Sequence, residues 1–137
     1  MVSFNKSNPV NPPMPNPNDI MGMKENTFCM LLHLSQLLIF TIPGIGLAVP
    51  IVLWAINKDT YPIVDQHGKI IFNWLISVFI YAVASGILFA AGIGVFMLVA
   101  VSIAMLAFPI IGGLKANDGT VWEYKVYNYP VSIKFLK

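Results

Sequence analysis

Apolar residues fill two long windows of the chain, and neither window carries a formal charge. No Asp, Glu, Lys or Arg occurs between Glu25 and Lys58 or between Lys69 and Lys115. Because a bilayer core takes about 20 helical residues per crossing, the second window fits two crossings and the first fits two short ones. The pattern therefore predicts an all-α membrane protein with four transmembrane helices arranged as two hairpins.

Turn-forming residues divide the first window. Pro43 and the glycines beside it predict a turn between a helix over 23–42 and a helix over 45–57. The second of these helices would be only about 20 Å long at 1.5 Å per residue. A hydrocarbon core is roughly 30 Å thick, so the sequence leaves open whether this helix crosses completely.

The second window divides in the same way. Gly92 and its small neighbours predict a tight turn between a helix over 69–90 and a helix that ends near Ala116. Pro109 and the glycine pair after it predict a kink in the last helix.

The sequence predicts three regions: a disordered Pro/Asn-rich tail over 1–22, a four-helix transmembrane domain over 23–116 and a tail over 117–137. In the second tail, aromatic residues from Trp122 onward alternate with polar residues, which predicts an extended segment at the membrane interface. The first tail lacks the apolar core of a signal peptide. We therefore expect insertion through the first helix into a bacterial inner membrane.

Composition and charge support this class and predict a topology. The chain is 57% hydrophobic and 10% charged, with a mean hydropathy of +0.74, whereas about a quarter of residues carry charge in soluble domains. Its net charge of +2 comes from eight lysines and six acids, with no arginine, which argues against a nucleic-acid partner. With four crossings, all eight lysines share one side. The positive-inside rule then predicts cytoplasmic termini, and two crossings would give the same pattern.

Polar residues form a stripe on each of two predicted helices. The stripes are Asn26, Cys29, His33 and Gln36 on the first helix, and Asn73, Ser77, Tyr81 and Ser85 on the third. Polar side chains in hydrocarbon cost free energy unless they are paired, so we expect the stripes to hydrogen-bond to each other. We favour this structural role, and a conduction or substrate path is the alternative.

The sequence predicts no catalytic residues, no metal and no cofactor. Cys29 and His33, four residues apart, would need His67 and further ligands to hold a metal, since soft-metal sites take three or four. The chain shows no nucleophile and base pair, phosphate-binding loop or paired carboxylates. We therefore expect a protein that is not an enzyme.

The connector over 58–69 carries Asp65, His67 and Lys69 at every second position. We interpret it as an ordered interfacial loop, in which Lys69 reaches lipid phosphate or pairs with Asp65 or Asp59. His67 would hydrogen-bond within the loop or to the aromatic tail. A solvated turn without a role is the alternative.

The order of several motifs resembles a known family. They are Leu31–Ser35, Pro43–Gly46 with Pro50, Trp54–Asp59, Asp65–Lys69 with Asn73, Gly113–Ala116, Gly119, Trp122 and Tyr129-Pro130. From about Glu25 to Leu136 the chain resembles the bacterial four-pass membrane proteins of unknown function grouped with the Tic-twenty component of the chloroplast inner-envelope translocon. Ile70 and Leu75 depart from that family's pattern.

The resemblance implies a four-helix membrane fold and, for the plastid relatives, a role in moving preproteins. A translocon-like or transport-associated component is therefore the first functional hypothesis. The second is a structural or stress-related membrane protein that acts by packing and partner binding. The expected partners are the lipid bilayer and either copies of the chain itself or other membrane proteins.

Overall fold

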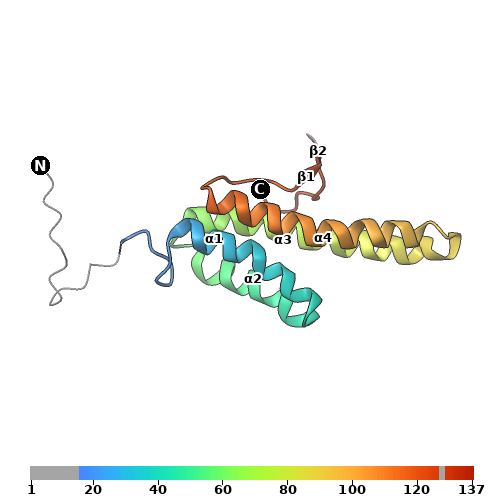
Figure 1. Ribbon diagram of the computed structural model, residues 1–137, viewed down its shortest axis with the longest axis horizontal. Coiled ribbons are helices and arrows are strands. Elements are labelled where there is room, and N and C mark those ends of the chain that lie inside the picture. Colours follow the sequence, from blue (N-terminus) through green and yellow to red (C-terminus); the bar gives the residue numbers. More distant parts are fainter. Residues whose placement is uncertain (1–15, 127–128) are drawn as a thin grey trace, which may run out of the picture.

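The computed structural model describes residues 16–126 and 129–137, most of them helical. The helices are α1 (Glu25–Leu34), α2 (Pro43–Asn57), α3 (Pro62–Leu88) and α4 (Gly94–Asn117), with the 3-10 segments η1 (Ser35–Phe40) and η2 (Phe89–Ala91) and the strands β1 (Lys125–Val126) and β2 (Tyr129–Pro130). The chain folds as two helical hairpins, α1–α2 and α3–α4, and the α3–α4 hairpin extends farther (Figure 1). The predicted all-α class is confirmed, with a minimal antiparallel β pair in the tail.

Two helical stretches are long and apolar enough to cross a membrane. They are Pro62–Ala91, which is α3 continued by η2 and has 30 residues, and α4 with 24 residues. Only 28% and 17% of their most apolar windows are buried in the protein, whereas a core helix of a soluble protein is mostly buried. α2 is apolar but has only 15 residues. Two crossings are thus supported by length and composition, and four remain a prediction.

The first predicted helix, 23–42, is shorter and less regular than expected. α1 ends at Leu34, and the chain continues as the 3-10 segment η1. Ser35 Oγ donates to the Leu32 carbonyl at 2.7 Å, a local bond that competes with regular helix geometry. η1 also lies very close to α2, because a Cβ at Gly46 would be 2.0 Å from the Ile39 nitrogen.

The third helix begins earlier than predicted, so the connector over 58–69 is wrong as a loop. α3 starts at Pro62, where a missing N–H costs nothing because the first helical N–H groups are unpaired anyway. Gly68 is a helix residue whose missing side chain makes room for Trp54, since a Cβ there would lie 2.0 Å from Trp54 Cδ1. Both residues resembled turn signals here, but Pro62 begins the helix and Gly68 makes room for Trp54.

The turn and helix at the other end of the α3–α4 hairpin follow the prediction. Gly92 adopts a left-handed conformation with φ of 77° directly after η2. α4 then runs from Gly94 to Asn117 and contains Pro109. The kink expected at Pro109 stays a prediction.

The hydrophobic core lies where both hairpins and the tail meet. One cluster of buried residues includes Phe28, Cys29 and Leu32 of α1 together with Ile71 of α3. Ile20 also belongs to it and is fully buried. Ile20 therefore packs onto the helices, whereas Asn18 and Met21 are exposed. The disordered tail stays a prediction, and residues 1–15 of it lie outside the described residues.

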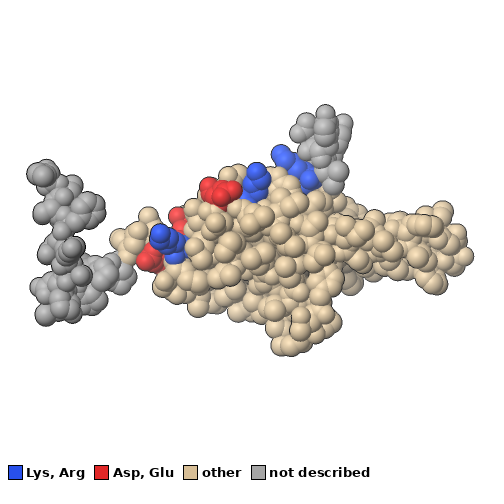
Figure 2. All heavy atoms as spheres, viewed as in Figure 1, with Lys and Arg blue, Asp and Glu red and all other residues tan. Residues whose placement is uncertain are grey.

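The far end of the α3–α4 hairpin combines exposed apolar residues with an absence of charge. In the view of Figure 2, Lys, Asp and Glu side chains gather over one half, and the far end of the α3–α4 hairpin shows none. We call residues 79–103 the distal hairpin. Its large apolar side chains are widely exposed, with Phe79 at 70%, Ile87 at 75% and Phe96 at 78%. Such a surface matches hydrocarbon better than water.

Candidate functional site

Four polar side chains meet in the interior where α1, α3 and the C-terminal tail converge. They are His33, Gln36, His67 and Tyr124, and we call them the buried network. Each is at most 1% exposed. Buried polar groups are costly unless they are hydrogen-bonded, so their arrangement is tightly determined.

The buried network is continuous across the three segments. His33 Nδ1 lies 2.7 Å from the Tyr124 hydroxyl, and His33 Nε2 lies 2.9 Å from His67 Nδ1. Gln36 Nε2 donates to the Tyr124 hydroxyl at 2.7 Å and to the His33 carbonyl at 3.2 Å. Both nitrogens of His33 are therefore used within the protein.

One arrangement of hydrogens satisfies these contacts. The Gln36 amide donates to Tyr124, so the tyrosine proton is free to be donated to His33 Nδ1. His33 then carries its own hydrogen on Nε2 and donates it to His67 Nδ1. All four side chains are neutral in this arrangement, which suits an interior without counter-charges.

Gly112 on α4 makes the close approach of these rings possible. A Cβ at this position would lie 2.7 Å from His33 Nδ1 and 2.7 Å from Tyr124 Cε1. Any side chain would force the two rings apart. Gly112, the first glycine of the pair that predicts a kink, thus provides space for the buried network.

Tyr124 is also the centre of an aromatic cluster. Its ring centroid lies 5.6 Å from those of Trp74 and Phe108 and 5.7 Å from that of Trp122. Complete burial raises the pKa of the Tyr124 phenol above its ordinary range, which keeps the hydroxyl protonated as a donor. The ring and hydroxyl of Tyr124 are buried among protein side chains and do not face lipid, and the interfacial position of the tail stays a prediction.

The polar residues of α3 bind the end of the tail. We call residues 131–136 the tail strap. Asn73 Oδ1 accepts from the Phe135 and Leu136 nitrogens at 3.0 and 2.7 Å, and its Nδ2 donates to the Leu136 carbonyl at 2.8 Å. Ser77 and Tyr81 continue the attachment. α3 therefore holds the tail strap through side-chain to backbone bonds.

The predicted hydrogen bonding between the two stripes is wrong. His33 and Gln36 turn toward His67 and Tyr124, whereas Asn73, Ser77 and Tyr81 turn toward the tail strap. The tail supplies hydrogen-bond partners to both stripes, so the two stripes do not need to hydrogen-bond to each other.

The remaining stripe residues have other surroundings. Asn26 is exposed and lies near Gly119, where a Cβ would be 3.3 Å from Asn26 Nδ2. Cys29 lies in the apolar core. Ser85 donates to the Tyr81 carbonyl of its own helix at 2.6 Å.

Asp65, His67 and Lys69 lie in the first turns of α3 and not in a loop. Asp65 pairs with Lys69 at 2.6 Å, as predicted, and accepts from Trp54 Nε1 at 3.1 Å. Successive helical residues lie about 100° apart around the axis, so Asp65 and Lys69 share one side of α3 and His67 lies on another, which faces the interior. Its partner is His33, and the bond predicted from His67 to its own loop or to the aromatic tail is wrong.

The expected absence of a metal and of a cofactor stays a prediction. Within the described residues there is no group of three or more His, Cys, Asp or Glu side chains that could hold a metal ion. His33 and His67 come together, whereas the sequence had separated them into membrane and loop. They supply two nitrogens, and those nitrogens face each other in a hydrogen bond.

Sequence reasoning missed Tyr124 and Gly112 as parts of this site. The available signal was the cost of placing His33 and Gln36 in an apolar helix, which requires a polar partner elsewhere in the chain. In the structure that polar partner is the hydroxyl of Tyr124, which is 91 residues away from His33 in the sequence.

Comparison with known proteins identifies one family. The MamF/MmsF family, described as the magnetosome magnetite crystal formation protein family, matches residues 24–136. No curated protein and no solved structure matches the chain. The resemblance to the Tic-twenty group is wrong, because the matching family over the same residues is a different one. The chain belongs to the MamF/MmsF magnetosome magnetite crystal formation protein family.

Proposed function

We propose that this chain is a multi-pass protein of the magnetosome membrane that contributes to magnetite crystal formation by packing and partner binding, without catalysing a reaction. The observation that carries the proposal is the family match over residues 24–136. The long, exposed apolar helices support residence in the membrane. The preprotein-moving role depended on the Tic-twenty resemblance and falls with it.

The proposed topology has α3 and α4 as full crossings. α3 has 27 residues and α4 has 24, so at 1.5 Å per residue they are about 40 and 36 Å long, enough for a core of roughly 30 Å. The α1–α2 hairpin is shorter and either crosses a thinned bilayer or enters without crossing. In both cases Lys24 and Lys58 lie on one side, which the positive-inside rule assigns to the cytoplasm.

This topology limits how the chain can act on a mineral. The side away from the cytoplasm would receive the turn around residues 89–93 and, if the α1–α2 hairpin crosses, also the turn around residues 41–43. Neither turn contains a charged residue. Carboxylates are the side chains that best bind hard cations and charged mineral surfaces, and all six acids lie on the other side. The contribution to crystal formation would therefore pass through the membrane or through a partner protein.

A role without catalysis fits the chemistry of the interior. The hydrogen-bonding groups of His33 and of the Tyr124 hydroxyl are engaged inside the protein. These bonds join α1, α3 and the tail into one unit. The buried network is thus suited to holding a shape that partners recognise.

Deletion and complementation in a magnetite-forming bacterium would test the role. We expect loss of the protein to change crystal size in electron micrographs, and the parent sequence to restore it. His33→Ala should fail to restore it, whereas Ser102→Ala, a change on the distal hairpin, should succeed at equal protein level. Crystals of parental size in the deletion strain would contradict the proposal.

A cysteine accessibility scan in a Cys29→Ser background would test the topology. Cysteines at positions 24, 58 and 137 should react from the cytoplasmic side, and a cysteine at position 91 should react from the other side. Labelling of positions 24 and 58 from opposite sides would exclude an even number of crossings between them.

A further inference from the structure

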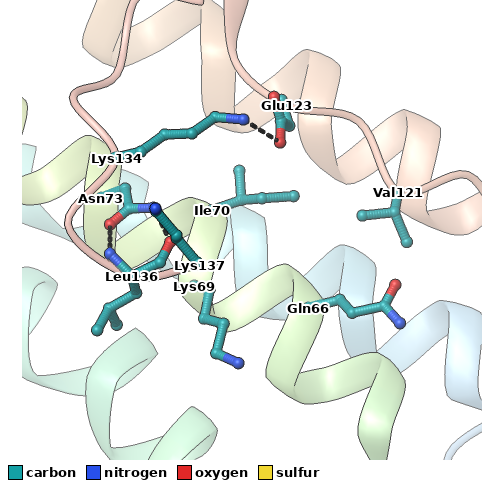
Figure 3. Close-up of a pocket in the computed structure, with 9 residues that line it drawn as sticks. All are labelled: Gln66, Lys69, Ile70, Asn73, Val121, Glu123, Lys134, Leu136 and Lys137. Atoms are coloured by element: carbon teal, nitrogen blue, oxygen red, sulfur yellow. Dashed lines mark hydrogen bonds and ion pairs between the residues drawn. The ribbon is translucent and has the colours of Figure 1, made fainter.

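A charged hollow of about 500 Å³ lies between the first part of α3 and the tail (Figure 3). Its lining includes Lys69, Lys134 and Lys137 as the cationic residues and Glu123 as the acidic one. Gln66 and Asn73 add amide groups from α3. The hollow is separate from the buried network, and the proposed function does not use it.

The charges of the lining do not cancel. Lys134 pairs with Glu123 at 3.1 Å, and Lys69 pairs with Asp65 at 2.6 Å. Among residues 16–126 and 129–137, Lys137 forms no ion pair. Counting Asp65, which pairs with Lys69, three lysines face two carboxylates and leave a formal charge of +1 at the hollow, so an anion would be attracted to it.

The tail backbone at the hollow is fixed before any ligand arrives. The three bonds from Asn73 hold residues 135 and 136, and Ser77 Oγ accepts from the Ile133 nitrogen at 2.6 Å. Lys134 and Lys137 therefore extend from an anchored backbone on either side of the Asn73 contact (Figure 3). A preorganised backbone lowers the ordering cost of binding.

The position of the hollow along α3 indicates the source of the anion. Lys69 is the last charged residue before the apolar run that begins at Ile70. Ile70, Val121 and Leu136 give the same hollow an apolar wall. A lysine cluster and an apolar wall at the end of a membrane-spanning helix match the depth of lipid headgroups, where basic pockets bind anionic lipids.

We propose that this hollow binds the phosphodiester group of an anionic phospholipid. The phosphate oxygens accept hydrogen bonds from the ammonium groups of Lys69, Lys134 and Lys137, and the apolar wall contacts the carbons next to the phosphate. Free inorganic phosphate is also an anion, but it has no carbon atoms that could contact the apolar wall. The inference rests on the membrane placement of α3 proposed above and is independent of the role in crystal formation.

Native mass spectrometry of the purified full chain would test this site. The chain would be released from nanodiscs of phosphatidylcholine with or without one fifth phosphatidylglycerol. The triple variant Lys69→Gln, Lys134→Gln, Lys137→Gln removes the lysines of the hollow. The matched control Lys24→Gln, Lys58→Gln, Lys115→Gln removes the same charge from residues outside the lining. Thermal unfolding of both variants verifies that they are folded.

We expect phosphatidylglycerol to remain bound to the parent and to the control variant. Its affinity should be lower by about tenfold or more in the hollow variant, because each lysine near an anionic headgroup contributes on the order of a tenfold factor or somewhat less. Equal loss in both triple variants would overturn the proposal in favour of general surface charge. Saturable binding of inorganic phosphate that displaces the lipid would overturn the assignment to a lipid. Since this assay involves no mineral, its failure is distinguishable from failure of the proposed function.

Discussion

The two ends of the α3–α4 hairpin are stabilised differently. At the end near the tail, buried polar groups make specific bonds, as between His33 and Tyr124 at 2.7 Å. In the distal hairpin, side chains such as Phe96 are 78% exposed, and within the described residues Ser102 bonds only its own helix. One end is specified by its internal partners, and the other is suited to lipid. Mutations should therefore have large effects at the first end and small effects at the second.

His33→Ala should have the largest effect. It leaves the Tyr124 hydroxyl proton without its acceptor and His67 Nδ1 without its donor, although Tyr124 still accepts from Gln36, and it opens a cavity. Each unpaired buried group costs about 1–3 kcal/mol, so the free energy of unfolding should fall by roughly 3–5 kcal/mol. Thermal unfolding in detergent measures this. Ser102→Ala in the distal hairpin should change it by less than about 0.5 kcal/mol, and equal effects would contradict the comparison.

Two helical glycines provide a matched pair. At Gly112 a Cβ would lie 2.7 Å from both His33 Nδ1 and Tyr124 Cε1, whereas nothing lies within 4 Å of one at Gly86. Gly112→Ala should lower the free energy of unfolding by about 1–3 kcal/mol through overpacking. Gly86→Ala should raise it by up to about 1 kcal/mol, because alanine favours the helix. A stabilising Gly112→Ala would show that the rings can move apart freely.

Alkaline unfolding should report the burial of Tyr124. Burial raises the pKa of its phenol, so the unfolded chain loses this proton at lower pH than the folded chain. The stabilisation is complete below the unfolded pKa of about 10. It then decreases by about 1.4 kcal/mol per pH unit until the folded pKa is reached. Tyr124→Phe should remove that part of the pH slope, and Tyr61→Phe should retain it.

Glu123→Gln should have the smallest effect. Its bond to Lys134 is 3.1 Å long, but both side chains are about half exposed. Such pairs contribute roughly 0–1 kcal/mol, so the free energy of unfolding, measured by thermal unfolding, should change by less than about 0.5 kcal/mol. A larger loss would mean that the tail strap depends on this ion pair and not only on Asn73.

Local sequence patterns predicted the elements but not their partners. The uncharged window from Lys69 to Lys115 indicated both long helices, and Gly92 marked the turn between them. The start of α3 was missed because Pro62 and Gly68 are residue types that also form loops. Here Pro62 begins the helix, and Gly68 lets the helix pack on Trp54. The shared use of the tail by α1 and α3 was missed because such pairings depend on the folded arrangement.

The tail strap and Tyr124 have a consequence for the order of assembly. A ribosome makes residues 1–120 before it makes the segment that satisfies His33 and Asn73. At about 5–20 residues per second, the interval needed for residues 121–136 is roughly 1–3 seconds. During that interval, the newly inserted helices carry polar side chains without hydrogen-bond partners in an apolar environment. The chain is therefore incompletely folded for a short time, during which quality-control proteases of the membrane can recognise it.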